Sequence, residues 1–424
     1  MTVGEAISYL ESHGWSHRRL GLSRERYLLS ALGEPQKQLT FLHVAGSNGK
    51  GSTCAMFASI LQKAGYRVGL FTSPHIEQFC ERIQINGQNI PDEDLVQWTQ
   101  HLRPIADAME DPPSLFELTT ALALAYFAQQ RCDIVVLEVG MGGMYDSTNA
   151  IPAPELTVIT NIGLEHTEFL GNTLTEIAAA KAGIIKSGSH CVAYESAPEV
   201  LAVLQERCHA CSIPFSLAEQ KGLRYLSSSP DGQEFCWHEK AYRLSLLGEH
   251  QLRNAAVVLT GIEILQSRGW NIPDQAIAEG LAHTHWPARF EILSRCPWFI
   301  LDGGHNPQCA QALSQCLRLI FPGEKVTFLI GFLSDKNYPA MIDYLQPYAR
   351  QFICVTPHSP RCLSGQDLQE YLEKRNIPAT FCPDVKSGID TAIRLSAGGI
   401  TVAFGSLYLA GEIRTVFRTY YSSK

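Results

Sequence analysis

The sequence has no excess of basic residues and no long hydrophobic run, and each absence excludes a class of protein. Charged residues make up 18% of the 424 positions, and acidic residues outnumber basic ones, so the formal net charge is −8. A chain of this charge is not a general binder of nucleic acid. A membrane-spanning helix needs about 20 consecutive apolar residues, and no such run occurs. The first residues, MTVGEAISYLESHGW, lack a signal-peptide pattern, so we expect a cytoplasmic protein that binds neither nucleic acid nor membrane.

The cysteines do not show the pattern of a disulfide framework or of a zinc site. Their number, thirteen, is odd, and they are scattered through apparent core segments. Cys208 and Cys211 form a C-x-x-C sequence at the end of a helical pattern, but no second pair accompanies it. A four-ligand zinc site needs more. We therefore expect reduced thiols that contribute to core packing.

Residues 41–53, FLHVAGSNGKGST, have the layout of a phosphate-binding loop. A short apolar run changes to glycines and small polar residues, and a helical pattern follows. In such loops, glycines let backbone N–H groups surround the phosphates, the helix N-terminus adds its positive end, and a lysine supplies a mobile charge. We expect Lys50 to reach the β- and γ-phosphates, and Ser52 or Thr53 to cap the helix or to face a magnesium ion.

The sequence of this stretch departs from the general phosphate-loop motif, G-x-x-x-x-G-K-[ST]. Val44 stands where the first glycine belongs, and Gly51 separates Lys50 from Ser52. Judged on this stretch alone, the alternative is a tight turn between a strand and a helix with a solvated lysine.

Two further positions at the ends of predicted strands point to metal chemistry. Residues 133–139, DIVVLEV, are typical of a central parallel strand that is buried on both faces. A carboxylate in such a run is unfavourable unless it is paired or bound to a metal, so Glu138 is either part of a salt bridge or a metal ligand. Ser73 follows another predicted strand, residues 66–72. It is either part of a Ser-Pro turn or a magnesium ligand.

The order of predicted strands and helices indicates an α/β fold with more than one domain. A length of 424 residues suggests two or three domains. Helical patterns fill residues 1–38, and strands and helices alternate after them, including a buried helix over 116–129. A second alternation begins near Pro297 and predicts a smaller domain with a mostly parallel sheet. We expect an ATP-binding domain with N-terminal helices over residues 1–296 and a Rossmann-like α/β domain over residues 297–424.

Taken in order, the motifs resemble those of the folylpolyglutamate synthase/dihydrofolate synthase family of the Mur ligase superfamily. The loop HVAGSNGKGS differs from that family's HVAGTNGKGS only at Ser47. The other matches are TSPH at 72–75, GMGGMYDSTN at 140–149, IGLEH at 162–166, a lysine at 181, GEHQLRNAA at 248–256, WPARFE at 286–291, DGGHNP at 302–307 and GSLYL at 405–409. The resemblance covers nearly the whole chain. It implies a P-loop, Mur-ligase-like ATPase domain with a mostly parallel sheet, followed by the smaller C-terminal domain.

The resemblance also implies which residues form the site. Lys181 matches a lysine that is carbamylated in the family, where it positions the acceptor end of the substrate or a second metal ion. The implied magnesium ligands are Ser73, Glu138 and His166. The implied folate-binding residues are Arg82, Phe116 and Asp146. The implied catalytic residues are Lys50, Lys181, His166, Asp302 and His305. The implied ATP-binding residues are Gly46, Ser47, Asn48, Gly49, Lys50, Gly51, Ser52, Asn254, Arg289 and Asp302.

The implied reaction is ATP-dependent formation of an amide bond. A substrate carboxylate attacks the γ-phosphate of ATP, and the amine of L-glutamate then attacks the resulting acyl phosphate. The carboxylate substrate is expected to be dihydropteroate, a reduced folate, or both, with Mg²⁺ and a monovalent cation as cofactors. We expect a monomer, because no interface signal stands out in the sequence.

Departures from the family pattern leave alternatives open. Met144 stands where the family has an arginine, and a methionine cannot hold an anion. Either another basic residue substitutes, or the substrate preference differs. Asn337 departs from a D-K-D motif, and Ala288 and Gly304 stand where the family has glycine and alanine. The alternative functions are a Mur-type ligase that acts on a cell-wall precursor and a non-catalytic ATP-dependent binding protein.

Overall fold

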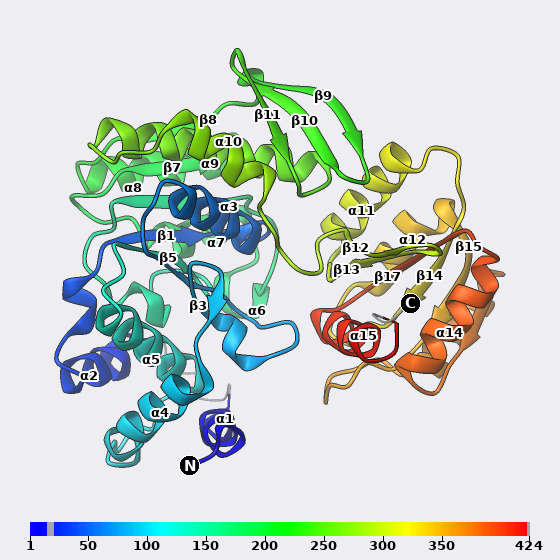
Figure 1. The fold of residues 1–424 in the computed structure, drawn as a ribbon, viewed down its shortest axis with the longest axis horizontal. Coiled ribbons are helices and arrows are strands. Elements are labelled where there is room, and N and C mark those ends of the chain that lie inside the picture. The colour runs from blue at the N-terminus through cyan, green and yellow to red at the C-terminus, as the bar shows by residue number, and fades with distance from the viewer. Residues whose placement is uncertain (15–20, 422–424) are drawn as a thin grey trace. The chain divides into compact units, whose positions relative to one another are not determined.

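The computed structural model describes residues 1–14 and 21–421 of the chain (Figure 1). The chain divides into two compact units. Unit 1 contains Met1–Tyr225, Phe235–Arg243 and Leu252–Thr284, and unit 2 contains Leu226–Glu234, Leu244–Gln251 and His285–Lys424. The domain boundary expected after residue 296 stays a prediction, since unit 2 also takes in residues upstream of it.

Unit 1 is built on an eight-stranded sheet. Its order is β4 (Gln88–Asn89), β3 (Ile83–Ile85), β2 (Val68–Phe71), β5 (Ile134–Glu138), β1 (Phe41–Ala45), β6 (Leu156–Ile159), β7 (Cys191–Tyr194) and β8 (Phe215–Ala218). Each strand is parallel to its neighbour along the series β2, β5, β1, β6, β7 and β8. The remaining two, β3 and β4, form an antiparallel hairpin at the β2 edge. The predicted mostly parallel sheet is therefore confirmed.

The central strands are apolar because helices cover both faces of a parallel sheet. Every residue of β1 and of β5 is buried, as the continuous apolar runs predict. Parallel strands end at the same edge of a sheet, so the segments that follow β1, β2, β5 and β6 all begin at one edge. The motifs that follow these four strands therefore lie at one edge of the sheet.

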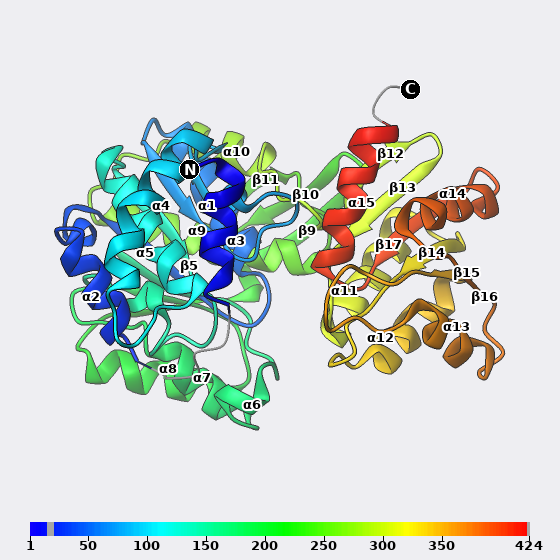
Figure 2. The same cartoon turned by 90° about the horizontal axis from the view of Figure 1, so that it is seen from below.

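Helices of unit 1 pack on the two sides of this sheet. One core cluster joins Leu10, Leu28, Leu95 and Leu118 to the sheet residue Val135, and α1, α4 and α5 lie side by side (Figure 2). A second cluster joins Ile177 and Leu204 to β6 and β7. The helical elements are α1 (Val3–Ser12), α2 (Ser23–Ala31), η1 (Pro35–Gln38), α3 (Lys50–Lys63), η2 (Phe79–Arg82), α4 (Asp92–Asp107), α5 (Leu115–Gln129), η3 (Ser147–Asn149), α6 (Thr167–Leu170), α7 (Leu174–Ala182), α8 (Pro198–Ala210), η4 (Gln220–Gly222), α9 (Glu249–Ser267) and α10 (Asp274–Ala282).

Unit 2 is built on a six-stranded, mostly parallel sheet. Its order is β12 (Glu291–Arg295), β13 (Trp298–Asp302), β17 (Ile400–Phe404), β14 (Val326–Ile330), β15 (Ala349–Cys354) and β16 (Ala379–Phe381), and only β12 is antiparallel to its neighbour. Its helices are α11 (Pro307–Ile320), α12 (Tyr338–Leu345), η5 (Gln346–Tyr348), α13 (Gly365–Glu373), α14 (Val385–Ser396) and α15 (Leu407–Tyr420). The predicted smaller α/β domain is confirmed.

A third, three-stranded sheet has the order β11 (Lys240–Leu244), β10 (Gly232–Trp237) and β9 (Leu223–Ser229). Its residues are shared between the two units.

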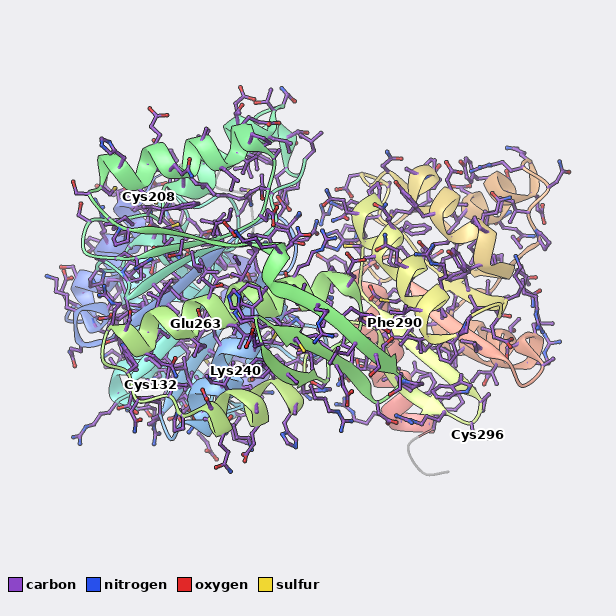
Figure 3. The ribbon with its side chains drawn as sticks, turned by 90° about the horizontal axis from the view of Figure 1, so that it is seen from above. Cys132, Cys208, Lys240, Glu263, Phe290 and Cys296 are labelled. Atoms are coloured by element: carbon purple, nitrogen blue, oxygen red, sulfur yellow. The ribbon has the colours of Figure 1, made fainter. Side chains whose placement is uncertain are left out.

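The thirteen cysteines are all free thiols, as expected from the sequence. Most are buried, including Cys132 and Cys208, whereas Cys296 is exposed at the turn between β12 and β13 (Figure 3). Within the described ranges 1–14 and 21–421, no helix has both the length and the apolar character needed to cross a membrane.

A buried group of charged residues lies where α2 packs against α5. The Arg24 Nε donates to both carboxylate oxygens of Glu117, at 3.0 and 3.1 Å. The neighbouring Glu25 is fully buried, and neither of its carboxylate oxygens has a hydrogen-bond partner among the described residues. Burial raises the pKa of Glu25 well above its usual value, and the charges of Glu117 and Asp146 raise it further. This environment favours the protonated acid.

We predict that Glu25→Gln stabilises the protein, and increasingly so as the pH rises. The native state holds the Glu25 proton to a higher pH than the unfolded chain does, so this group lowers the stability of the wild type as the pH rises above the unfolded pKa of about 4.3. Glutamine keeps the shape without ionising. The gain in the free energy of unfolding should reach about 1 kcal/mol or more near pH 8. Urea unfolding at several pH values measures it.

Glu206→Gln, on an exposed position of α8, is the matched control and should leave the pH profile of stability unchanged. If the pH profiles of stability for wild type and Glu25→Gln superimposed, the pKa of Glu25 would not be raised in the native state.

Candidate active site

The segment between β1 and α3 is a glycine loop whose backbone leaves no room for side chains at two positions. Gly46 has φ +155° and Gly49 has φ +87°. A Cβ atom on Gly46 would lie 1.7 Å from the Thr160 Oγ1, and one on Gly49 would lie 2.7 Å from the Asn254 Oδ1. Glycine is therefore required at both positions. The Asn254 amide, which the resemblance assigns to adenine, packs against the loop at Gly49.

The loop is tied to the end of β6 by a set of hydrogen bonds. The Ser47 N–H donates to the Asn161 carbonyl at 2.7 Å, and the Ser47 hydroxyl lies 2.9 Å from the Gly163 carbonyl and 3.0 Å from the Gly163 nitrogen. The Thr160 hydroxyl donates to the Asn48 carbonyl at 2.9 Å. These bonds hold the loop between two parallel strand ends, as a preformed phosphate site requires.

Two lysines converge on one carbonyl of the loop. The Lys50 Nζ donates to the Gly46 oxygen at 3.0 Å, and the Lys181 Nζ, from α7, donates to the same oxygen at 2.8 Å. Lys181 is buried and pairs with Glu165 Oε1 at 2.7 Å. Burial lowers the pKa of Lys181 to about 8, and the charge of Lys50 contributes to the shift. Although burial acts against the charge of Glu165, the two lysines hold its pKa below the usual value.

Ser73 and Glu138 meet at the same sheet edge, after β2 and at the end of β5. The Ser73 N–H donates to the Glu138 Oε2 at 3.1 Å, and Glu138 is buried. A serine hydroxyl and a carboxylate are oxygen donors of the kind that Mg²⁺ prefers, so this pair fits a magnesium ion. Among the described residues, no three His, Cys, Asp or Glu side chains form a metal cluster by themselves.

His166, the third predicted magnesium ligand, lies on an exposed turn that caps α6. Its backbone has φ +46°, in the left-handed region. The structure joins Ser73 to Glu138 directly, and the magnesium-ligand roles of all three residues stay predictions.

Asp146 is buried in the loop after β5, and its own loop uses most of its acceptor capacity. Its Oδ1 accepts from the Thr148 N–H at 3.1 Å and from the Thr148 hydroxyl at 2.5 Å, and its Oδ2 accepts from the Met141 N–H at 2.9 Å. Burial raises the pKa of Asp146, whereas these donors lower it. A Cβ atom on Gly140 would meet both the Phe116 ring and Asp146. The structure therefore brings two of the predicted folate-binding residues together.

His43, in β1, extends this network and was not identified from the sequence. Its Nε2 lies 2.9 Å from the Thr148 Oγ1. Since the Thr148 hydroxyl donates to Asp146, His43 must donate to Thr148, which assigns the proton to Nε2. Burial lowers the pKa of His43 well below its usual value, and the charge of Lys186 adds to this. The sequence signal was a polar residue within a fully apolar strand.

Arg82, the third predicted folate-binding residue, is buried at the same sheet edge. Its Nε donates to the His75 Nδ1 at 2.9 Å, its guanidinium lies 5.2 Å from the centre of the Phe79 ring, and its carbonyl accepts from the Thr72 N–H at 3.0 Å. Burial and the charge of Arg82 lower the pKa of His75 to about 4. His75 is therefore neutral at physiological pH, and Arg82 carries the charge.

In unit 2, Asp302 ends β13 beside a turn that holds its carboxylate. The Oδ2 accepts from the N–H of Phe290 (labelled in Figure 3) at 3.0 Å, and the Oδ1 accepts from the Gly304 N–H at 2.8 Å. Burial raises the pKa of Asp302, whereas the charge of Arg289 lowers it. His305 lies three residues on, with its Nδ1 3.4 Å from the Gly303 carbonyl.

The structure gives physical reasons for two departures from the family pattern in unit 2. A Cβ atom on Gly304 would lie 2.6 Å from both the Cys309 Cβ and the Phe404 ring, so alanine does not fit here. The Asn337 side chain accepts from the Ala340 N–H at 3.3 Å and thereby caps α12. Ala288, in contrast, has φ +53°, a backbone conformation that favours glycine.

Comparisons with known proteins agree with this geometry. Residues 44–261 match the Mur ligase middle domain, and residues 288–407 match the Mur ligase glutamate ligase domain. A dihydrofolate synthase/folylpolyglutamate synthase of Bacillus subtilis (strain 168) is 37% identical, over 96% of this chain and 98% of its own. A folylpolyglutamate synthase of Lacticaseibacillus casei is 34% identical over 98% of each chain.

Solved structures show the same similarity. A Mycobacterium tuberculosis folylpolyglutamate synthase complexed with ADP and AMPPCP has a TM-score of 0.89 at 29% identity, over 98% of each chain. E. coli FolC in complex with DHPP and ADP has a TM-score of 0.87 at 28% identity, over 100% of this chain and 99% of its own.

We predict opposite effects on stability for two substitutions that introduce the family residue. Ala288→Gly relieves a left-handed alanine and should raise the free energy of unfolding by about 1 kcal/mol. Gly304→Ala forces a Cβ atom into an occupied space and should lower it by about 1–3 kcal/mol. Urea unfolding measures both.

Ala410→Gly, at a buried position inside α15, is the control and should destabilise by about 1 kcal/mol, as glycine does in a helix. A loss of stability of that size in Ala288→Gly would show that the left-handed conformation carries no strain.

Proposed function

This chain belongs to the Mur ligase family, and we propose that it is an ATP-dependent ligase that joins L-glutamate to the carboxyl group of dihydropteroate or of a reduced folate. The observation that carries the proposal is the convergence of Lys50 and Lys181 on the Gly46 carbonyl of the glycine loop, at the sheet edge that also holds Ser73 and Glu138. Such an edge combines a phosphate cradle with oxygen ligands for a cation.

The reaction has two steps. In the first, an oxygen of the substrate carboxylate attacks the γ-phosphorus of ATP, so that an acyl phosphate forms and ADP leaves. In the second, the amine of L-glutamate attacks the acyl carbon, the new amide bond forms, and inorganic phosphate leaves with the loss of a proton from the amine. Acyl phosphates hydrolyse readily, and exclusion of water protects them.

Lys50 is proposed to contact the transferred phosphate. Its ammonium rests on the Gly46 and Ser47 carbonyls, at 3.0 and 3.4 Å, and the flexible side chain can exchange these neutral acceptors for anionic phosphate oxygens. Charge-assisted bonds of that kind are stronger than bonds to carbonyls, and they stabilise the charge that is transferred. Backbone N–H groups of the loop from Gly46 to Ser52 and the Asn254 amide are proposed to bind the rest of the nucleotide.

Ser73 and Glu138, with His166, are proposed to hold a magnesium ion. A bound Mg²⁺ neutralises charge on the phosphate oxygens during transfer. The Ser73 N–H donates to Glu138 and thereby orients this carboxylate at the sheet edge. The buried position of Glu138 near the strand end favours a charge partner over solvent.

Lys181 is proposed to be carbamylated. An amine reacts with carbon dioxide only in its neutral form, and burial lowers the pKa of Lys181 to about 8, so the neutral amine is accessible. The carbamate is an anion, so its formation would end the ion pair between Lys181 and Glu165. It would then position the acceptor end of the substrate, a second magnesium ion or a monovalent cation.

Arg82, Phe116 and Asp146 are proposed to bind the acyl substrate. Phe116 and Asp146 lie together at Gly140, which offers a ring for stacking and an acceptor for the amino and N–H groups of a pterin. In unit 2, Asp302 and His305 are proposed to be catalytic, and Arg289 is proposed to contact ATP. The monomeric state and the cytoplasmic location expected from the sequence stay predictions.

We predict that Lys50→Ala abolishes turnover. Release of phosphate from ATP in the presence of L-glutamate, measured separately with dihydropteroate and with tetrahydrofolate, should fall by about 100-fold or more, because a charge that stabilises the transferred phosphate is lost. Lys63→Ala, at the exposed end of the same helix, is the control. Intact turnover in Lys50→Ala would show that the phosphate-loop assignment is wrong.

We also predict that isotopically labelled bicarbonate places a carbamate carbon on Lys181 near pH 8, seen by nuclear magnetic resonance. The signal should be absent from Lys181→Arg, since the guanidinium stays charged. Lys186 also has a pKa lowered to about 8 by burial, so Lys186→Arg is the matched control and should keep the signal. If the signal disappeared only in Lys186→Arg, the carbamate would be on Lys186, and the proposal for Lys181 would be wrong.

A further inference from the structure

An open cavity of about 570 Å³ lies beside the loop that contains Met144, and its charge is of one sign. Among the described residues that line it, only Arg26 and Lys186 are charged, and both are basic. The chain as a whole is acidic, with a net charge of −8, so the charge of this cavity is opposite in sign to that of the chain. A concentration of positive charge in a hollow favours anions.

The Arg26 guanidinium is available to a ligand. Arg26 is exposed on α2, and its side chain has no ion pair or hydrogen bond with any described residue. Arginine presents planar donors that match a carboxylate in a bidentate manner. Its neighbours Arg24 and Glu25 point to the interior, so Arg26 is the charged residue of this turn that faces the cavity.

Lys186 supplies a second, more fixed cation. Its Nζ donates to the carbonyls of Asn149 and Ile151, at 2.9 and 2.7 Å, which leaves one of its three donors for a ligand. Burial lowers the pKa of Lys186 to about 8, and the charge acting on it is that of Arg26. A bound anion would relieve the repulsion between these two cations.

The cavity is built on the same loop as the proposed substrate site. The Met144 N–H donates to the Ala180 carbonyl at 3.0 Å, one residue before Lys181, and Asp146 lies two residues after Met144. The side chains of Met144 and Tyr145 are 42% and 53% exposed. They leave an apolar and aromatic wall beside the two cations, which suits a chain of carboxylates joined by methylene groups.

We infer that this cavity binds the α-carboxylates of the γ-glutamyl tail of a folate substrate, with Arg26 as the specificity-determining residue and Lys186 as its fixed partner. The inference rests on the proposed function and names its substrate class. Dihydropteroate has only the carboxylate that reacts, whereas each glutamate already attached adds an α-carboxylate that needs a cation. Arg26 and Lys186 thereby supply the positive charge that Met144 does not.

The test compares acyl substrates that differ in the number of α-carboxylates. Arg26→Gln should raise the KM for tetrahydrofolate and for its di- and triglutamate by about 10-fold, the usual effect of losing a charge-assisted hydrogen bond. The KM for dihydropteroate and for ATP and the kcat for all substrates should stay unchanged. Arg26→Glu should raise the KM for the glutamylated substrates further. Lys63→Gln, a charge loss at an exposed position outside this cavity, should change none of these values.

An equal change in KM for dihydropteroate, or no change for the triglutamate, would overturn the inference. Arg26 is exposed, so its variants should fold, and thermal unfolding checks this. A wild type that releases no phosphate with any acyl substrate would refute the proposed function instead.

Calorimetry with free tri-γ-glutamate then tests the cavity independently. Binding to the wild type that is lost in Arg26→Gln would support the inference. Binding of inorganic phosphate in place of the peptide, or of neither ligand, would overturn it.

Discussion

The carbonyl oxygen of Gly46 is the point on which the centre of unit 1 depends, because two ammonium groups donate to it. Lys50 reaches it from α3 and Lys181 from α7. This is possible only because Gly46 has no side chain, since Thr160 occupies the space where a Cβ atom would lie. Two like charges so close together repel each other, and Glu165 offsets this repulsion through its ion pair with Lys181. The glycine loop thus carries an excess of positive charge, which favours a bound anion.

The loop after β5 forms a second centre, and it is held by buried polar groups. Asp146 accepts from its own loop, Thr148 links it to His43 in β1, and the nearby Glu25 has no hydrogen-bond partner among the described residues. Burial keeps His43 neutral and favours the protonated form of Glu25. The bonds within the loop therefore use most of the acceptor capacity of Asp146. Positive charge lies outside the loop, on Arg82 with its guanidinium over Phe79 and in the cavity beside Met144.

Departures from the family pattern are accommodated in different ways. Gly304 is required because Cys309 and Phe404 fill the space that a methyl group would need, and Asn337 takes over the capping of α12. Ala288 adopts a left-handed backbone conformation, which costs less free energy for the family's glycine than for alanine. Met144, where the family has an arginine, lines an open cavity together with Arg26 and Lys186, which are far from it in the sequence. Only folding brings these three residues together.

The sequence by itself determined the strands, the glycine loop and the class of fold, because these depend on local properties. The continuous apolar runs of β1 and β5 predict strands that are buried on both faces, and the positive φ angles of Gly46 and Gly49 favour glycine through the residue's own backbone. The close approach of Thr160 and Asn254 to these two glycines depends on the fold instead. The tertiary structure determines which polar and charged residues lie close together. The shared Gly46 carbonyl joins residues 135 positions apart, the His43–Thr148 bond joins residues 105 apart, and Arg26 and Lys186 come from separate helices and loops. Protonation states depend on burial and on neighbours in space, so the neutral His43, the lowered pKa of Lys181 and the raised pKa of Glu25 follow only from the tertiary structure.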